Sequence, residues 1–220
     1  DSYMETLDHM IPHAGYKQYT PNIDVQTGMN LTNRVWNVML RGIVGQNSAR
    51  LREAVQALSP VFDYVTSGDG FYEDGSFIQH GHLAYIGSYG EGLLNTIGKI
   101  FYLVDGSTFD ITDPDRVNVW NWIEDSYIPA IHKGATLNML RGRDFGKQDH
   151  EAGRRIIISM ARLVEMMPED LAQESASWIR YWVEEDTSFD NYYATTQLGL
   201  SDLVQLKTIV QNAVEIVPEL

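Results

Sequence analysis

The chain has 220 residues, no cysteine, and 30 Asp and Glu against 16 Lys and Arg, which gives a formal net charge of −14. This length suffices for one sizeable domain with its own core. The lack of cysteine excludes disulfides, thiolate metal sites and a cysteine nucleophile. The acidic balance argues against general nucleic-acid binding, and no apolar run reaches the roughly 18 residues that a membrane-spanning helix needs.

Periodic apolar positions predict helices over most of the chain. The first helix begins near Asn30, and its apolar residues fall on one face: Val35, Val38, Met39 and Ile43. A second helix is expected over residues 49–64, with Ser48 as its N-cap. Residues 67–76 are rich in glycine, serine and aspartate, a composition that is typical of turns and predicts a long loop.

Helices also follow this loop at nearly regular spacing. One is expected from about Gly81 to Val104, and Asp113-Pro114 then has the sequence of an N-cap followed by a first helical residue. The remaining helices are expected over these ranges: 149–166, 169–185 and 199–216. The chain is therefore predicted to be all-α, with stacked helical hairpins in a single domain that covers residues 1–220.

Short motifs occur in a specific order along these elements. They are Thr27-Gly28-Met29-Asn30, then Gly68-Asp69-Gly70 through Phe77-Ile78-Gln79-His80, then Tyr85-x-Gly87-x-Tyr89-Gly90, and finally Arg141-Gly142-Arg143. This ordered set resembles polysaccharide lyase family 8, which contains hyaluronate, chondroitin AC and xanthan lyases. Three further stretches are most similar to xanthan lyases: Gly106-Ser107-Thr108 through Asp113-Pro114, Asn118-Val119-Trp120-x-Trp122, and Lys133-Gly134-Ala135.

The resemblance implies a fold and a setting for the chain. The family fold is an incomplete (α/α) toroid followed by β-sandwich domains, so residues 1–220 are expected to be a helical catalytic-domain fragment without those sandwiches. The expected partners are an anionic polysaccharide and the remaining domains of the parent chain, and neither nucleic acid nor a membrane. Secretion is expected from the same resemblance, and no cofactor or metal is expected.

β-Elimination on a uronate needs a group that stabilises the anion, a base and an acid. The C5 proton is a poor acid, and an amide that donates to the adjacent carboxylate, aided by a cation, makes the enolate-like intermediate accessible. The resemblance places Asn30 and Arg143 in these roles, and His80 and Tyr89 in proton transfer. An imidazole has a reference pKa of about 6.5, and a phenol beside a guanidinium can serve as acid or base. Either His80 or Tyr89 can therefore be the base.

Substrate binding is expected to involve five further residues: Gln79, Tyr85, Trp120, Arg141 and Lys147. The cations of this acidic chain are concentrated between residues 141 and 155, where an anionic polymer needs them. Lys147 stands where the family usually has a second arginine, and a lysine keeps the charge but loses the bidentate fork for a carboxylate. The first expected substrate is xanthan, at the bond between terminal mannose and glucuronate. Hyaluronan or chondroitin comes second.

Other functions are also compatible with the residues. A glycoside hydrolase on a helical toroid would need two carboxylates across a cleft, and Asp69 with Asp186 is the available pair. A non-enzymatic alternative is that the fragment only binds acidic glycan, without turnover. A metal at His80 and His82 lacks obvious further ligands, and the acidic loop around Asp69 and Asp74 is more compatible with a turn that delivers His80 than with a calcium site.

Overall fold

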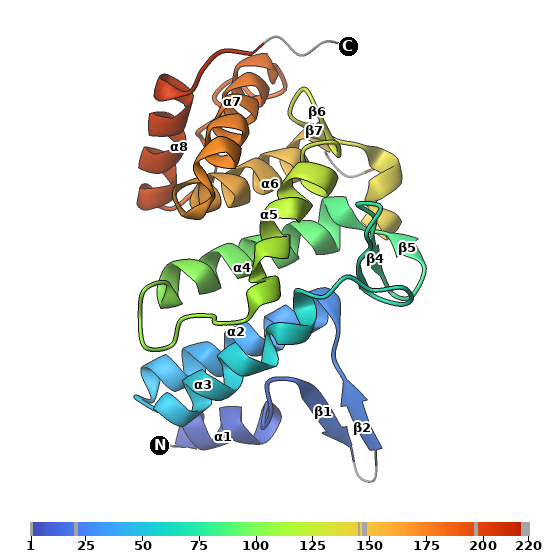
Figure 1. Ribbon diagram of the computed structural model, residues 1–220, viewed down its shortest axis with the longest axis vertical. Helices are drawn as coiled ribbons and strands as arrows, with labels where there is room; N and C mark the ends of the chain where they lie inside the picture. The colour runs from blue at the N-terminus through green and yellow to red at the C-terminus, as the bar shows by residue number, and fades with distance from the viewer. Residues whose placement is uncertain (1, 20–21, 145, 147–148, 196–197, 217–220) are drawn as a thin grey trace.

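The computed structural model describes residues 2–19, 22–144, 146, 149–195 and 198–216. Its helices follow one another along the long axis of the molecule, from α1 at one end to α7 and α8 at the other (Figure 1). In this part of the chain the α-helices are α1 (Ser2–Met10), α2 (Gly28–Val44), α3 (Ser48–Ala57), α4 (Glu91–Val104), α5 (Asn118–Trp122), α6 (Asp149–Leu163), α7 (Glu169–Glu185) and α8 (Leu200–Asn212). Within these ranges, no helix combines the length and apolar character needed to cross a bilayer.

Short antiparallel strands and tight turns connect the helices. The strand pairs are β1 (Tyr16–Tyr19) with β2 (Asn22–Val25), β4 (Phe77–Gln79) with both β3 (Gly70–Phe71) and β5 (Leu83–Ala84), and β6 (Ile131–His132) with β7 (Ala135–Thr136). 3-10 turns cover Ser59–Val61, Pro114–Val117, Asn138–Leu140, Gly142–Asp144 and Val164–Met166, and π-helical turns cover Ile86–Gly90 and Ile123–Tyr127. Helices dominate this arrangement, so the all-α prediction is confirmed.

Helices α2, α4, α6 and α8 form a series in which each packs on the next, while α3 packs on α2 and α7 packs on α6 and α8. The predicted apolar face of α2 is confirmed for Val35, Val38 and Met39, which are buried. Ile43 differs, because it lies in the last turn of α2 and 43% of it is exposed.

Aromatic side chains connect the β3–β4–β5 sheet to the helical core. Phe71 stacks on Trp122 with ring centroids 4.1 Å apart, and both side chains are fully buried. The fully buried Tyr127 donates from its hydroxyl to the carbonyl oxygen of Gly90 at 2.6 Å. Burial raises the pKa of Tyr127 well above its usual value, which keeps the phenol protonated as a donor. This hydrogen bond fixes the backbone at the start of α4.

Helix boundaries differ from prediction where local side-chain chemistry intervenes. Asn47, rather than Ser48, caps α3, because its side chain accepts hydrogen bonds from the N–H groups of Ala49 and Arg50 at 3.1 Å each. The same helix ends at Ala57 and a 3-10 turn that contains Pro60 follows, because proline cannot donate a helical hydrogen bond.

The helix predicted to begin near Gly81 begins instead at Glu91. His80 and Gly81 adopt left-handed backbone angles, with φ of +57° and +79°, and reverse the chain so that β5 pairs with β4. The loop predicted over residues 67–76 accordingly contains β3, which completes a small three-stranded sheet. This sheet lies beside the start of α4 (Figure 1), and His80 is at the turn between its strands β4 and β5.

Candidate active site

His80 lies at the turn between β4 and β5 and is exposed. A φ of +57° is uncommon for a residue with a side chain and has an energetic cost, so the surrounding structure must hold it. Asp69 supplies part of that support, since its carboxylate accepts the backbone N–H of Gly81 at 2.6 Å. The prediction that the acidic loop shapes the turn at His80 is confirmed for Asp69.

Tyr85 directly precedes the π-helical turn before α4, and Tyr89 lies within that turn. Their ring centroids are 4.8 Å apart, and the His80 ring meets Tyr89 edge-on at 4.8 Å. Tyr85 is buried, whereas Tyr89 is partly exposed beside His80. Gly87, between the two tyrosines, packs closely on β7, since a Cβ there would lie 2.4 Å from Thr136 Cγ2.

Arg143 completes a cluster with these three rings. Its Nη2 lies 3.2 Å from His80 Nε2, and its Nε donates to the Tyr85 hydroxyl at 3.3 Å. A guanidinium has donors and no acceptor, so His80 Nε2 must present its lone pair and the imidazole is neutral in this arrangement. The contact with Tyr85 raises the pKa of Arg143 above its usual value, with a smaller contribution from Tyr89. The cluster therefore places a permanent cation beside two phenols.

Gly142 allows Arg143 to reach this position. The backbone of Gly142 has φ +53°, and a Cβ there would lie 2.6 Å from two atoms of the Tyr85 ring. Asp144, which follows Arg143 in the chain, accepts a hydrogen bond from the hydroxyl of Ser88 in the π-helical turn. Sequence reasoning missed Ser88 and Asp144, because the two residues are 56 positions apart and Ser88 is an unspecified position of the tyrosine motif.

Asn30 is exposed in the first turn of α2. It is connected to the cluster through its neighbour, because the Met29 N–H donates to the Gln79 side-chain oxygen at 3.1 Å. One hydrogen bond therefore joins the residue before Asn30 to the residue before His80. The structure thus brings His80, Tyr89 and Arg143 together and connects α2 to the β4–β5 hairpin, which carries His80.

Several residues expected to bind substrate instead lie beneath this cluster. Gln79 and Tyr85 are buried, and Arg141 is 1% exposed with its Nη1 2.5 Å from the Asp149 carboxylate. Arg141 is therefore ion-paired inside the protein, where a buried charge requires a partner. These three placements suit a supporting role, and the expected contact with substrate stays a prediction.

Trp120, which was expected to bind sugar, is also largely buried. It is 9% exposed and meets the Phe101 ring edge-on at 5.9 Å, so most of its apolar area belongs to the core. The expectation for Lys147 lies outside the described residues.

Asp69 and Asp186, the carboxylates considered for hydrolysis, serve separate networks. Asp69 binds the hairpin at Gly81, whereas Asp186 is buried at the end of α7 with its Oδ1 3.0 Å from His150 Nδ1. Among the described residues, no three His, Cys, Asp or Glu side chains gather as they would around a metal ion. His82 accordingly has no group of further ligands there.

A hollow of about 680 Å³ opens between the β1–β2 hairpin, the start of α2 and the β3 segment. Thr27 and Gly28 line it together with Tyr64, Thr66 and Asp69. Its volume falls within the range of small-molecule pockets in proteins. Since Asn30 follows Gly28 closely in the chain, the hollow lies next to the helix that carries this amide.

A family model described as "Polysaccharide lyase family 8, N terminal alpha-helical domain" matches residues 1–181. The chain belongs to polysaccharide lyase family 8. Among curated family members, the xanthan lyase of Bacillus sp. (strain GL1) is 34% identical over 99% of this chain, and the hyaluronate lyase of Thermasporomyces composti is 31% identical over all of it. The chain spans 22% and 28% of the length of these two proteins.

Solved lyases of this family have the same fold. The chondroitin AC lyase of Streptomyces coelicolor A3, in complex with chondroitin sulphate, superposes with a TM-score of 0.88 at 34% identity over 98% of this chain and 30% of that protein. A Paenibacillus xanthan lyase gives a TM-score of 0.81 at 30% identity, over 99% and 20% of the two chains. These matches bear out the expected part of an (α/α) toroid.

Proposed function

We propose that this chain is the helical catalytic domain of a longer, secreted polysaccharide lyase. The enzyme would cleave an acidic polysaccharide next to glucuronate by β-elimination and leave a 4,5-unsaturated uronyl product. The observation that carries this proposal is the joint position of Tyr89, His80 and the Arg143 guanidinium at one exposed surface. Asn30 is connected to that surface through the Met29–Gln79 hydrogen bond.

In the proposed reaction, Tyr89 carries the proton. Its phenolate, stabilised by Arg143, removes the C5 proton, and the electron pair of the C5–H bond becomes the C4–C5 double bond. The C4–O4 bond breaks towards O4, and the Tyr89 hydroxyl returns the proton to that oxygen. Charge that develops on the uronate carboxylate is stabilised by the Asn30 amide. The cycle consumes no water and needs no cofactor.

His80 is assigned to substrate binding as a neutral imidazole rather than to proton removal. Its Nε2 lone pair faces Arg143 at 3.2 Å, so this nitrogen already accepts a hydrogen bond. The other ring nitrogen then carries the hydrogen and can donate to a sugar oxygen. This arrangement favours Tyr89 as the base, the role that the sequence left open between the two residues.

Xanthan, cleaved between terminal mannose and glucuronate, is the first substrate we propose, and hyaluronan or chondroitin is the second. The preference rests on the stretches at residues 106–114, 118–122 and 133–135, which are most similar to xanthan lyases. Identity to a xanthan lyase and to a chondroitin AC lyase is equal at 34%, so overall similarity favours neither polymer.

The decisive experiment incubates the full-length protein with xanthan, hyaluronan and chondroitin separately. The proposal expects an absorbance increase in the ultraviolet, from the new conjugated double bond, with one polymer. The product mass should show elimination, because a hydrolysis product is heavier by one water. Glycan binding without turnover of any polymer would support the non-catalytic alternative, and products that contain the added water would support a hydrolase.

A further inference from the structure

Asp69 and Gln79 form a hydrogen-bonded bridge between the start of α2 and the turn at His80. Gln79 Nε2 donates to Asp69 Oδ2 at 2.5 Å, and the other carboxylate oxygen accepts the Gly81 N–H at 2.6 Å. The Gln79 oxygen accepts the Met29 N–H at 3.1 Å. Gln79 is fully buried, so its two contacts are largely shielded from water, whereas the Asp69–Gly81 contact is exposed.

The bridge has a fixed direction. A backbone N–H can only donate, so the Gln79 amide must turn its oxygen towards Met29 and its NH₂ group towards Asp69. The carboxylate of Asp69 can only accept, which suits both the NH₂ group and the Gly81 N–H. Gln79 therefore fits in one orientation, because a reversed amide would oppose its NH₂ group to the Met29 N–H and its oxygen to the Asp69 carboxylate.

The two ends of this bridge adjoin the residues that the reaction needs. His80 lies between Gln79 and Gly81, both of which are held, and its own backbone is in the strained left-handed region with φ +57°. Asn30 directly follows Met29, whose N–H is the other end of the bridge. Gly28 packs against the same amide, because a Cβ there would lie 2.5 Å from the Gln79 oxygen.

We propose that Asp69 and Gln79 are positioning residues that hold Asn30 and His80 in one fixed relation. This role rests on the proposed lyase function, because it matters for turnover only if Asn30 and His80 act on the same sugar. It also replaces the two earlier roles of these residues, since Asp69 acts as a hydrogen-bond acceptor rather than a hydrolytic acid and Gln79 does not contact substrate.

The test reverses the bridge and then restores it in the full-length protein. Asp69→Asn places an NH₂ group against one of two donors, the Gln79 NH₂ group or the Gly81 N–H, and Gln79→Glu places a carboxylate against that of Asp69. Each single variant should lower kcat by a factor on the order of 10², the loss expected when reacting groups shift by about 1 Å. In the double variant Asp69→Asn/Gln79→Glu, the introduced amide donates to the introduced carboxylate, which still accepts the Met29 N–H. The kcat of the double variant should be at least about tenfold higher than that of either single variant. It should stay below that of the natural protein, because the charge moves to a more buried position.

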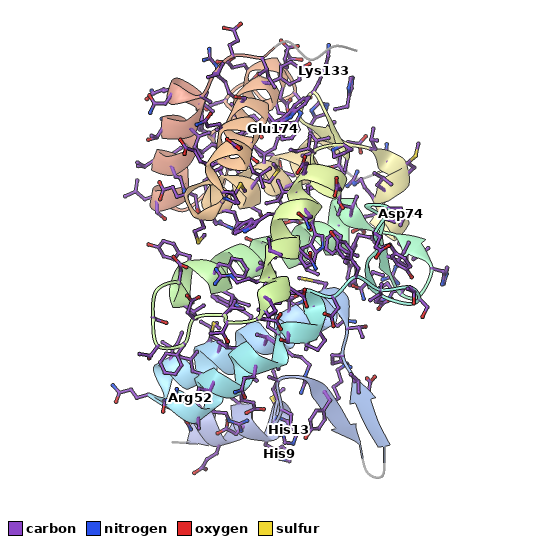
Figure 2. The ribbon with its side chains drawn as sticks, viewed as in Figure 1. His9, His13, Arg52, Asp74, Lys133 and Glu174 are labelled. Atoms are coloured by element: carbon purple, nitrogen blue, oxygen red, sulfur yellow. The ribbon has the colours of Figure 1, made fainter. Side chains whose placement is uncertain are left out.

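Asp74→Asn is the matched control, because it makes the same chemical change in the neighbouring β3–β4 turn. Asp74 is exposed, accepts the Ser76 N–H at 2.9 Å, and an asparagine oxygen can accept it too. It lies in the same region of the molecule as the β4–β5 hairpin (Figure 2). Its kcat should stay within about twofold of the natural protein.

Hydrogen exchange at the Gly81 and Met29 amides gives a readout that does not depend on turnover. Both amides should exchange faster in each single variant and slow again in the double variant. Lack of recovery in the double variant, in exchange and in kcat, would refute the positioning role, and so would unchanged exchange and kcat in the single variants. If the natural protein acts on no polymer, the proposed lyase function fails, and the exchange data still decide whether the bridge holds the two segments together.

Discussion

Replacing Gly142 with alanine tests how Arg143 is delivered to the site. Gly142 has φ +53°, and its new Cβ would lie 2.6 Å from Tyr85 Cε2 and Cζ. Ordinary contact between carbon atoms is about 3.5–4.0 Å, so the ring and the loop must separate by about 1 Å. That movement pulls the Arg143 side chain away from its hydrogen bond with the Tyr85 hydroxyl.

The expected cost combines two contributions. An alanine in the left-handed region costs about 1–2 kcal/mol, and overpacking against a buried ring adds about 1–3 kcal/mol. Gly142→Ala should therefore lower the free energy of unfolding by about 2–5 kcal/mol. Gly106→Ala is the control, because Gly106 has φ +66° and a Cβ added there would meet no described atom within 4 Å, so it should lose only about 1–2 kcal/mol.

Urea denaturation of both variants measures this difference, and product absorbance measures turnover. Gly142→Ala should reduce turnover by a factor on the order of 10², while Gly106→Ala should leave it unchanged. Equal stabilities in the two variants, together with full activity of Gly142→Ala, would refute the account of Gly142 as a steric requirement for the site.

Three further results are expected from the same reasoning. Tyr89→Phe should abolish elimination with the fold intact, while Tyr102→Phe, at a side chain that is 76% exposed on α4, should retain full turnover in the absorbance assay. Asn30→Ala should lower kcat by a factor on the order of 10²–10³, the usual loss for one oxyanion-type donor, and normal turnover would remove Asn30 from the mechanism. Hydrogen bonds from Arg162 lower the pKa of Asp202 below its ordinary 3.8, so this pair should stabilise α8 above that pH and lose its effect as the pH falls through the lowered pKa. Thermal unfolding of Asp202→Asn should accordingly show a deficit at neutral pH that disappears in acid.

The helices were largely predictable because their apolar residues repeat with the helical period. Residues 149–166 and 169–185 were expected to be helical and contain α6 and α7. In α7 the buried Ser175, Ile179 and Trp182 recur at that spacing, whereas α6 is buried on nearly all sides. The turn at His80 was not predictable in this way, because the apolar residues of β5 and the π-helical turn continue the pattern of α4. Only the pairing of β4 with β5 reveals that the chain reverses there.

The proposed catalytic residues come from ordered motifs, whereas the residues that support them were not predicted. Arg141 and Gln79 are polar, and polar side chains are usually exposed, so direct substrate contact was the natural expectation. Each is buried against a partner outside its own element. Arg141 pairs with Asp149 at the start of α6, and Gln79 donates to Asp69, which precedes β3. Local sequence patterns carry no signal for such pairings.

The π-helical turn Ile86–Gly90 has a consequence for how this protein can be engineered. Its wide turn closes through the Gly90 N–H and the Tyr85 carbonyl, 3.0 Å apart, and contains one residue more than an α-helical turn. Deleting a residue there would regularise the helix, a change that stability engineering favours. Each residue in a helix turns the chain by ~100°. The same deletion would therefore rotate Tyr85, which precedes the turn, relative to α4 and away from the His80 imidazole. Variants selected for thermal stability alone would therefore tend to lose the proposed turnover through changes at this turn.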